Sequence, residues 1–336
     1  MRQIVFDNRW SGEHGIGRFT REVRTRLPGT TIDLAGCNPV SPLGLLELER
    51  VSWGRRSNPA LFFSPGYTPP IRWSGPVVFT VHDLIHLDVP EERSNFKTLY
   101  YNRVVRPAMH RAQRVLTVSE YSRQRLLEWS GVAPEQVVVV GNGVDSTFAP
   151  EGRVHQPGYP YVLCVSNTKP HKNVRGLLQA FAQLDLPDLR LVLSGRADAA
   201  TRHEALRLGI DHRVVFTGRL SEGALAAHYR GAEVVTLPSL YEGFGLPPLE
   251  AMASGIPVVV SDTTSLPEVV GNAGLLVDPR DPESIADGLN RAVTDTALRQ
   301  TLRARGLERV RMFCWDDVAR RVRRELGPRG VEWETP

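Results

Sequence analysis

Short apolar runs rich in β-branched residues alternate along the chain with amphipathic stretches of helical period. The runs predict strands at 4–6, 60–64, 77–81, 115–118 and 137–140 in the first half, and at 161–166, 190–194, 214–216, 234–237, 257–261 and 275–277 in the second. Helices are expected at 16–27, 94–112 and 120–130, and after each strand of the second half. Strands that alternate with helices are typical of parallel βαβ units. The pattern therefore predicts two doubly wound α/β domains.

A turn-rich stretch without periodicity separates the two sets of strands. It follows Asn142-Gly143-Val144-Asp145 and contains Pro150, Gly152, Pro157, Gly158 and Pro160. Proline and glycine at this density are typical of a linker. We expect a first domain over 1–150, a linker over 151–159 and a second domain from 160 to 313. A chain of 336 residues is long for one core, and its 41% hydrophobic content can fill two.

The formal net charge is only +4, but the arginines are concentrated between 103 and 125 and between 299 and 324. Solvated helix faces are the favoured explanation. The alternative is attraction to anionic lipid headgroups at the inner face of a membrane, or to a pyrophosphate-linked acceptor. The basic stretches lack interleaved aromatic residues, so nucleic acid is not expected as a partner.

Cysteine use and hydropathy indicate a cytoplasmic protein. Cys37, Cys164 and Cys314 lie far apart without CxxC spacing, which predicts neither a zinc site nor a disulfide framework. No apolar run approaches the roughly 20 residues that span a bilayer, and the first residues read as a strand rather than a signal peptide.

The most informative motif is Glu242-Gly-Phe-Gly-Leu-Pro-Pro-Leu-Glu250, between an apolar strand and an apolar helix. A loop at the carboxyl end of a buried strand is where open α/β sheets hold ligands. Gly243 and Gly245 let the backbone approach a ligand closely, and a helix that opens at about Pro247 or Pro248 offers amides to an anion. The alternatives are a solvated Glu242 and a Glu250 that only complements the helix dipole.

A second candidate loop, Asn167-Thr-Lys169-Pro-His-Lys172-Asn173, follows the first strand of the second domain. Asn173 is expected to cap the next helix, which places Lys172 just outside its amino end. A cation there is unfavourable unless an anion bridges it to the helix, so the loop predicts a diphosphate site.

Two features of the first domain are more ambiguous. Gly15-Ile-Gly17 opens a helix after the first strand, where its amides can face a phosphate or simply form a turn. The third glycine of a dinucleotide fingerprint is absent, which argues against a nicotinamide dehydrogenase. His82, with Asp83, His86 and Asp88, is open to a second interpretation as a zinc or iron cluster.

Together these motifs resemble the E-x7-E signature of retaining GT-B glycosyltransferases, in particular glycosyltransferase family 4. Segments matching the family cover almost the whole chain: Gly15-Ile-Gly17-Arg18, His82-Asp83, 118–122, 142–145 and Phe313-Cys-Trp315. The resemblance implies two facing Rossmann-like domains with parallel sheets and the site in the inter-domain cleft. It also implies that the first domain binds the acceptor, that the second binds the nucleotide sugar, and that a last helix, 314–327, crosses back onto the first domain.

The resemblance assigns roles to individual residues. Lys172, the Gly243–Gly245 amides and Gly17 would stabilise the departing diphosphate without a metal, with Gly15, Phe244 and Leu246 beside them. Glu242 is placed on hydroxyls of the transferred sugar, Glu250 on the ribose and His82 on the donor sugar, whereas His86 is expected to be structural. Relatives often carry arginine where this chain has Asn167, and Lys169 is the candidate to replace its charge.

The function implied is retaining transfer of a hexose from a nucleotide-diphosphate sugar to a hydroxyl of a glycan, lipid-linked or small-molecule acceptor. GDP-mannose is the favoured donor, with UDP- and dTDP-sugars as alternatives, and no cofactor or metal is expected. Same-face attack is preferred to a covalent intermediate. The rival functions are a nucleotide-sugar epimerase or phosphorylase on the same fold, and a non-catalytic sugar-nucleotide-binding module.

Overall fold

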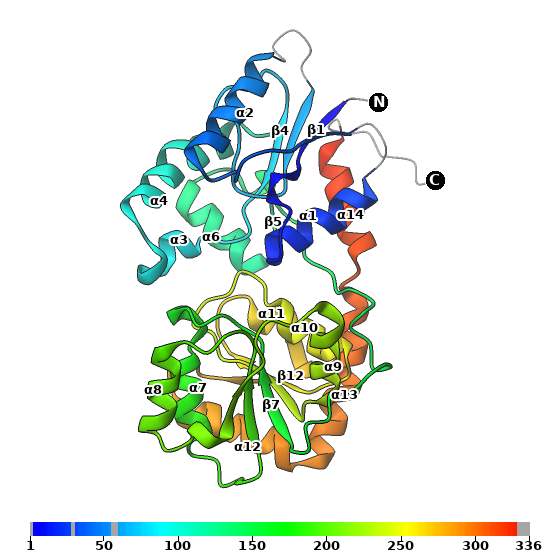
Figure 1. The fold of residues 1–336 in the computed structure, drawn as a ribbon. Coiled ribbons are helices and arrows are strands. Elements are labelled where there is room, and N and C mark those ends of the chain that lie inside the picture. The colour runs from blue at the N-terminus through cyan, green and yellow to red at the C-terminus, as the bar shows by residue number, and fades with distance from the viewer. Residues whose placement is uncertain (1–2, 28–30, 55–59, 328–336) are drawn as a thin grey trace. The chain divides into compact units, whose positions relative to one another are not determined.

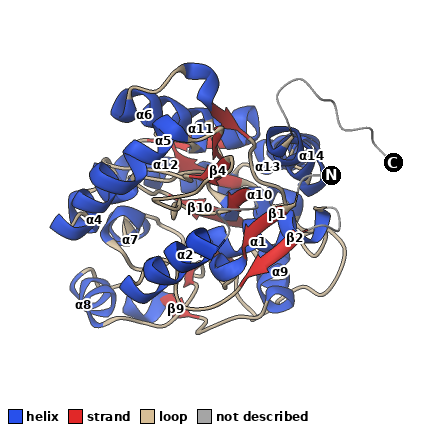
Figure 2. Ribbon diagram, turned by 90° about the horizontal axis from the view of Figure 1, so that it is seen from above, coloured by secondary structure: helices blue, strands red, loops and turns tan. Residues whose placement is uncertain are grey.

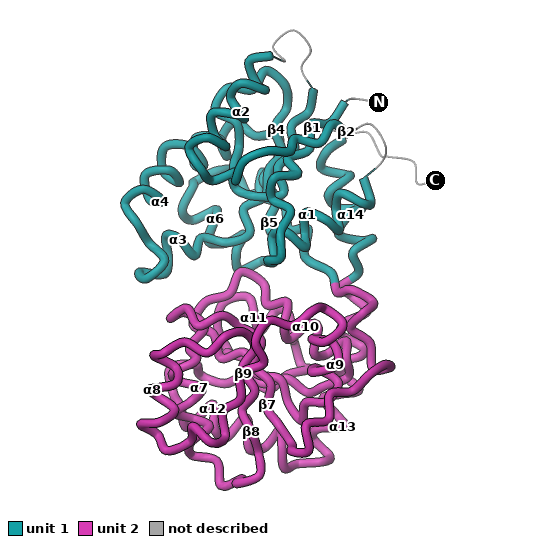
Figure 3. The backbone as a smooth tube through the Cα atoms, viewed as in Figure 1, with its two compact units in different colours: residues 1–143, 314–336 teal, residues 144–313 magenta. Residues whose placement is uncertain are grey.

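The computed structural model describes residues 3–27, 31–54 and 60–327. The chain divides into two compact units, one formed by 1–143 with 314–336 and the other by 144–313 (Figure 3). The boundary therefore lies at Gly143–Val144 rather than at 150, and the expected linker 151–159 belongs to the second unit. The segment that begins at Cys314 is part of the first unit.

Unit 1 is built on a six-stranded sheet with the order β2-β1-β3-β4-β5-β6, in which every pairing is parallel. Its strands are β1 (Ile4–Asp7), β2 (Thr31–Leu34), β3 (Leu61–Ser64), β4 (Val77–Thr80), β5 (Arg114–Thr117) and β6 (Val137–Val139). Its helices are α1 (Gly15–Arg26), α2 (Pro42–Gly54), α3 (Ile85–Asp88), α4 (Asn95–Tyr100), α5 (Arg106–Arg111), α6 (Glu120–Ser130) and α14 (Trp315–Leu326).

Strand β2 and helix α2 were not expected from the sequence. The single helix expected at 94–112 is a continuous run in which a π-helical turn, Tyr101–Val105, separates α4 from α5.

Both faces of the unit 1 sheet are covered by helices. Successive β4 residues point to opposite sides of the sheet, and each side has its own apolar cluster. Val78 packs in the cluster of α1 and α14, which includes Phe19, Trp315 and Val322, whereas Phe79 packs with residues of α5 and α6. The terminal helix α14 lies beside α1 (Figure 1).

Unit 2 contains a second parallel six-stranded sheet, with the order β12-β11-β10-β7-β8-β9. The strands are β7 (Tyr161–Cys164), β8 (Arg190–Leu193), β9 (Val214–Phe216), β10 (Val234–Leu237), β11 (Val258–Ser261) and β12 (Gly274–Val277). The helices are α7 (Val174–Phe181), α8 (Ala199–Arg207), α9 (Glu222–Gly231), α10 (Leu246–Ala253), α11 (Leu266–Val270), α12 (Pro282–Thr294) and α13 (Thr296–Arg309). Helices flank the strands of both sheets (Figure 2).

The strand order reverses once in each sheet. In unit 1 the chain leaves β1 toward β2 and then returns to β3 on the other side of β1; in unit 2 it leaves β7 toward β8 and returns to β10. The loops after β1 and β3, and those after β7 and β10, therefore diverge at the carboxyl edge. Open α/β sheets bind ligands at such switch points. No helix in the described part of the chain is both long and apolar enough to span a bilayer.

A tight contact at the end of unit 1 generates a stability prediction. A Cβ added at Gly143 would lie 2.6 Å from the backbone nitrogen of Trp315 and 2.7 Å from its ring. We expect Gly143→Ala to lower the free energy of unfolding by about 1–3 kcal/mol through overpacking. Gly54→Ala is the matched control, since a Cβ there meets nothing within 4 Å. Thermal melts of both variants test this, and equal melting temperatures would contradict it.

Candidate functional site

The centre of the unit 2 site is an ion pair between Lys172 and Glu242. Lys172 Nζ donates hydrogen bonds to Glu242 Oε1 at 2.7 Å and Oε2 at 2.8 Å. Lys172 ends a short 3-10 turn after β7, and Glu242 lies in the loop after β10. The side chains are 18% and 11% exposed. Lys172 and Glu242, which were expected to bind different parts of a substrate, thus meet at the β7–β10 switch point of the unit 2 sheet.

The loop that carries Glu242 is fixed by hydroxyl groups. Ser239 Oγ donates to Glu242 Oε1 at 2.8 Å, and the Glu242 amide donates to Thr264 Oγ1 at 3.2 Å. Ser265 Oγ bridges the backbone carbonyls of Glu242 and Phe244, at 3.0 and 2.9 Å. The carboxylate is therefore held in one orientation by its own loop as well as by Lys172.

Lys172 is positioned by the residue that follows it. Asn173 adopts a left-handed conformation with φ of 56°, and its Nδ2 donates to the carbonyls of Pro238 at 3.0 Å and Pro279 at 2.6 Å. Asn173 is the N-cap residue of α7, as expected, but its side chain makes no capping hydrogen bond, because its amide group binds these neighbouring loops instead. Asn173 joins the Lys172 loop to the loop after β10.

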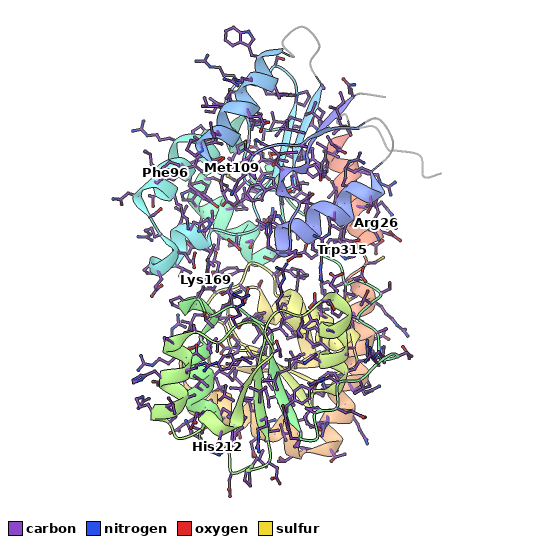
Figure 4. All side chains as sticks on the ribbon, in the orientation of Figure 1. Arg26, Phe96, Met109, Lys169, His212 and Trp315 are labelled. Carbon is purple, nitrogen blue, oxygen red and sulfur yellow. The ribbon has the colours of Figure 1, made fainter. Side chains whose placement is uncertain are left out.

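Two further candidate residues of the Lys172 loop lie at its surface. Asn167 and Lys169 are exposed, and the Lys169 amide donates to Asn167 Oδ1 at 3.2 Å, which shapes a local turn. Figure 4 labels Lys169. Whether its charge replaces an arginine at Asn167 stays a prediction.

The second glutamate of the motif is buried. Helix α10 begins at Leu246, so Glu250 is its fifth residue rather than near its third. Its side chain accepts a hydrogen bond from the Tyr229 hydroxyl on α9 at 2.8 Å, and Glu250 is 5% exposed. Gly245 precedes the helix with φ of 104°, and a Cβ there would lie 2.5 Å from Leu266. Gly243 and Phe244 are also buried, and Leu246 is half-buried.

A cavity of about 450 Å³ opens at the carboxyl ends of β7, β8 and β9, and the sequence interpretation missed it. Its walls come from the loops after β7, β8 and β9 and from α9: Val165, Ser194, Gly195, Arg196, Gly218, Arg219, Leu220 and Leu225. Gly195 and Gly218 have φ of 90° and 67° and exchange backbone hydrogen bonds of 3.0 Å. The sequence signal for this cavity is a Gly-Arg pair that recurs two residues after the end of β8 and of β9.

In unit 1, His82 follows β4 and supports the loop after β3. Its Nε2 donates to the Pro65 carbonyl at 2.9 Å, and its ring meets the edge of Phe19 with centroids 5.1 Å apart. Burial lowers the pKa of His82 to about 4, with a small further contribution from His14, while the Pro65 bond opposes the shift. The imidazole is therefore neutral near pH 7 and carries its proton on Nε2.

The groups of the alternative metal cluster bind other partners. His86 Nδ1 accepts from Lys97 Nζ at 3.1 Å, Asp83 Oδ1 accepts from the Ile85 amide at 3.0 Å, and Asp88 pairs with Arg125 at 2.8 Å. Over the described residues, no group of three or more His, Cys, Asp or Glu side chains is arranged to hold a metal ion.

The glycine motif at the start of α1 is closely packed. Gly15 is the first residue of α1, and the Gly17 amide donates to the His14 ring at 3.0 Å. A Cβ at Gly17 would lie 2.1 Å from the Gly12 carbonyl oxygen. The close approach of two backbone segments therefore explains why residue 17 is a glycine. The Gly17 amide already has the His14 ring as its hydrogen-bond partner.

Comparison with known proteins identifies the family of the chain. The family model described as glycosyltransferase family 4 matches 17–148, and the model of glycosyl transferases group 1 matches 145–309. O-antigen chain mannosyltransferase B of Escherichia coli is 30% identical over 297 residues, which cover 81% of this chain and 76% of the relative. The chain belongs to glycosyltransferase family 4. The MMP alpha-(1->4)-mannosyltransferase of Mycolicibacterium hassiacum is 40% identical over 214 residues, 61% of this chain and 51% of the relative.

Solved structures confirm the GT-B fold class. Sucrose-phosphate synthase of Thermosynechococcus elongatus has a TM-score of 0.77 at 22% identity and covers 96% of this chain and 98% of its own. Anabaena HepE, solved in complex with UDP and glucose, has a TM-score of 0.78 at 19% identity, with 97% and 99% covered. The protein is a glycosyltransferase built from two Rossmann-like units. Lys172, Glu242, Glu250 and the glycine loop between the two glutamates lie in unit 2, and Gly15, Gly17 and His82 lie in unit 1.

The neutral state of His82 predicts a pH dependence of stability. Its pKa rises from about 4 in the folded protein to its ordinary 6.5 on unfolding, so the unfolded chain binds the extra proton between these values. Its contribution to stability is complete above pH 6.5 and is lost as the pH falls toward 4. We expect wild type to lose about 2 kcal/mol more than His82→Gln between pH 7 and pH 5. Glutamine can donate to Pro65 without titrating. Urea unfolding at both pH values measures the difference, and parallel losses would contradict the burial of a neutral imidazole.

Proposed function

We propose that this glycosyltransferase moves mannose from GDP-mannose to a hydroxyl of a glycan or lipid-linked acceptor, with retention and without a metal, in polysaccharide or glycoconjugate biosynthesis. The observation that carries the proposal is the Lys172–Glu242 pair, which joins the loops after β7 and β10. The mannosyltransferase names of the matched relatives support the sugar.

The unit 2 loops suit a departing diphosphate. Breaking the bond between sugar and phosphate leaves negative charge on the nucleoside diphosphate, and preorganised donors stabilise such charge most effectively. Lys172 precedes the amino end of α7, and Gly243 and Gly245 precede that of α10. An ammonium ion and two helix amino ends together supply the positive potential that a metal provides in other transferases.

Glu242 is suited to orienting the transferred sugar rather than attacking it. Its Oε1 accepts bonds from both Lys172 and Ser239, whereas its Oε2 accepts one from Lys172. Carboxylate oxygens have about two lone-pair sites each, so Oε2 retains capacity for a sugar hydroxyl. A carboxylate held by an ammonium group and a hydroxyl is a weak nucleophile, which favours same-face attack over a covalent intermediate.

The cavity at the ends of β7, β8 and β9 is the proposed nucleoside site. Leu225 lines it from α9, and Tyr229, one helical turn further along α9, donates to Glu250. This bond ties Glu250 to the helix that lines the cavity, which supports the proposed ribose contact. Arg196 and Arg219 flank the cavity, and arginine matches the paired O6 and N7 acceptors of guanine, which uracil lacks.

A donor screen by product mass tests the function. Purified protein is incubated with GDP-mannose, UDP-glucose or dTDP-glucose and mannoside acceptors, in buffer with and without EDTA. We expect a product heavier than the acceptor by one hexose residue from GDP-mannose in both buffers, and NMR of this product distinguishes an α- from a β-linkage. Activity lost in EDTA and restored by magnesium would overturn metal independence, and product from the other donors alone would overturn the guanine assignment. Donor converted without transfer would support the epimerase or phosphorylase class.

Lys172→Ala tests the role of the ion pair in catalysis. Because the ammonium group stabilises charge that grows in the transition state, we expect kcat to fall by about 10²–10³. Lys172→Arg keeps the positive charge and should retain more activity. Steady-state kinetics with GDP-mannose, after a melt confirms folding, measures the effect.

Lys169→Ala is the matched control from the same loop. A loss comparable to that of Lys172→Ala would show that Lys169 supplies the second positive charge beside Asn167, and unchanged kinetics would leave Lys172 acting alone. A kcat near the wild-type value for Lys172→Ala would overturn the diphosphate assignment.

A further inference from the structure

Two residues of unit 2 have a backbone conformation that residues with a side chain rarely adopt. Over the part of the chain that the structure describes, Asn173 and Thr264 are the only residues other than glycine with a positive φ, of 56° and 60°. Asn173 follows Lys172, and Thr264 binds the amide of Glu242. Both conformations therefore lie beside the ion pair that carries the proposed function.

The left-handed conformation is more costly for Thr264 than for Asn173. Asparagine enters this region several times more often than most residues, whereas a β-branched side chain there is crowded by the backbone. Such strain persists only where surrounding contacts hold the residue in place, and it is concentrated at functional sites. The contacts of Thr264 must therefore compensate for its strain.

The Thr264 hydroxyl joins the loop after β11 to the loop after β10. Thr264 Oγ1 donates to the Thr263 carbonyl at 2.7 Å and accepts from the Glu242 amide at 3.2 Å. The first bond uses the hydroxyl proton, so the oxygen faces the Glu242 N–H group as an acceptor. The hydroxyl is thereby fixed in one orientation.

The next residue binds the other polar group of the Glu242 backbone. Ser265 is fully buried, and its Oγ lies 3.0 Å from the Glu242 carbonyl oxygen. Successive side chains of an extended segment point to opposite sides. The left-handed turn at Thr264 instead lets two consecutive side chains converge on the N–H and the C=O of one residue.

The loop that carries Glu242 needs this support from outside. Gly243 and Gly245 follow Glu242 closely, and glycine leaves the backbone freer than any other residue. Lys172 and Ser239 bind only the carboxylate of Glu242. A side chain holds a substrate group in place only if its own backbone is fixed, and a misplacement of about 1 Å can reduce the rate by roughly 100-fold.

We propose that Thr264 is a positioning residue for Glu242, held in a strained conformation that directs its hydroxyl at the Glu242 amide. The inference rests on the proposed function, in which the Glu242 carboxylate orients the transferred sugar. A change at Thr264 therefore acts on sugar transfer more than on nucleotide binding, because GDP has no sugar for Glu242 to hold. It also separates activity from stability, since the strain lowers stability and the positioning supports activity.

Three substitutions separate the hydroxyl from the strain. Thr264→Val removes the hydroxyl and keeps a β-branched side chain, Thr264→Gly removes both the hydroxyl and the strain, and Thr264→Ser keeps the hydroxyl. Steady-state kinetics use GDP-mannose with octyl α-D-mannopyranoside as the acceptor, and titration calorimetry measures GDP affinity. We expect kcat to fall about tenfold in both Thr264→Val and Thr264→Gly, with GDP affinity within about twofold of the wild type. Thr264→Ser should rescue kcat.

Thermal melts of the same variants distinguish positioning from a general structural role. Glycine normally lowers stability in a loop, because it gives the unfolded chain more freedom. Here we expect Thr264→Gly to melt about 2–4 °C above Thr264→Val, because it relieves the left-handed strain. Equal losses of kcat in two variants of different stability support positioning. A kcat that follows the melting temperature, or one unchanged in Thr264→Val, would overturn it, and Thr264→Gly melting no higher than Thr264→Val would overturn the strain.

Thr147→Gly is the matched control. Thr147 is an exposed loop residue of unit 2, its φ is not positive, and its amide donates to Asp145 Oδ1, a bond that glycine keeps. This variant should melt below the wild type and leave kcat unchanged.

If the wild-type protein transfers no mannose, the proposed donor or reaction is wrong, and the contact is tested without catalysis. Hydrogen exchange then compares the peptide that contains Glu242 in the wild type and the three Thr264 variants. Faster exchange in Thr264→Val and Thr264→Gly, but not in Thr264→Ser, supports the contact. Equal exchange in all four proteins overturns it.

Discussion

The architecture depends on one constraint of parallel sheets: all strands end at the same edge, and ligands bind where neighbouring connections diverge. In unit 2 the constraint brings Lys172 and Glu242 together although they are 70 residues apart in the sequence. Strands buried on both faces supply the rigid base, since β7, β10 and β11 are fully buried. The loops at their ends are then cross-linked by hydroxyl and amide side chains such as Ser265 and Asn173.

An ion pair at this depth holds both charged groups ready for the proposed substrate. Removing two charges from water has a cost that their mutual attraction only partly offsets, and a lone buried charge is still less favourable. In the proposed reaction a diphosphate that enters beside Lys172 is a second anion for the ammonium group, and Glu242 keeps its bonds to Lys172 and to the hydroxyl of Ser239. The pair therefore holds both groups in position before substrate arrives.

The sequence predicts elements well where burial imposes a pattern and poorly where it does not. The buried strands appear as apolar runs, but β2 lies at the edge of its sheet, where Ile32 is 36% exposed, and α2 exposes Leu43 and Leu46 at 68% and 59%. Both elements therefore lack a clear alternation. The loops that carry Lys172 and Glu242 were recognisable as candidates from their chemistry, but the partners of these residues were not. The bond from Tyr229 to Glu250 and the contacts of Asn173 join residues that only the tertiary structure brings together.

The two switch points differ in their charged groups. In unit 2 Lys172 pairs with Glu242, and Arg196 and Arg219 line the cavity at the ends of the neighbouring strands. In unit 1 Arg9 pairs with Asp7 in the interior, and His82 is uncharged near pH 7. The cationic side chains of unit 2 create a local potential that attracts anions. This is the physical reason why the proposed diphosphate site lies in unit 2.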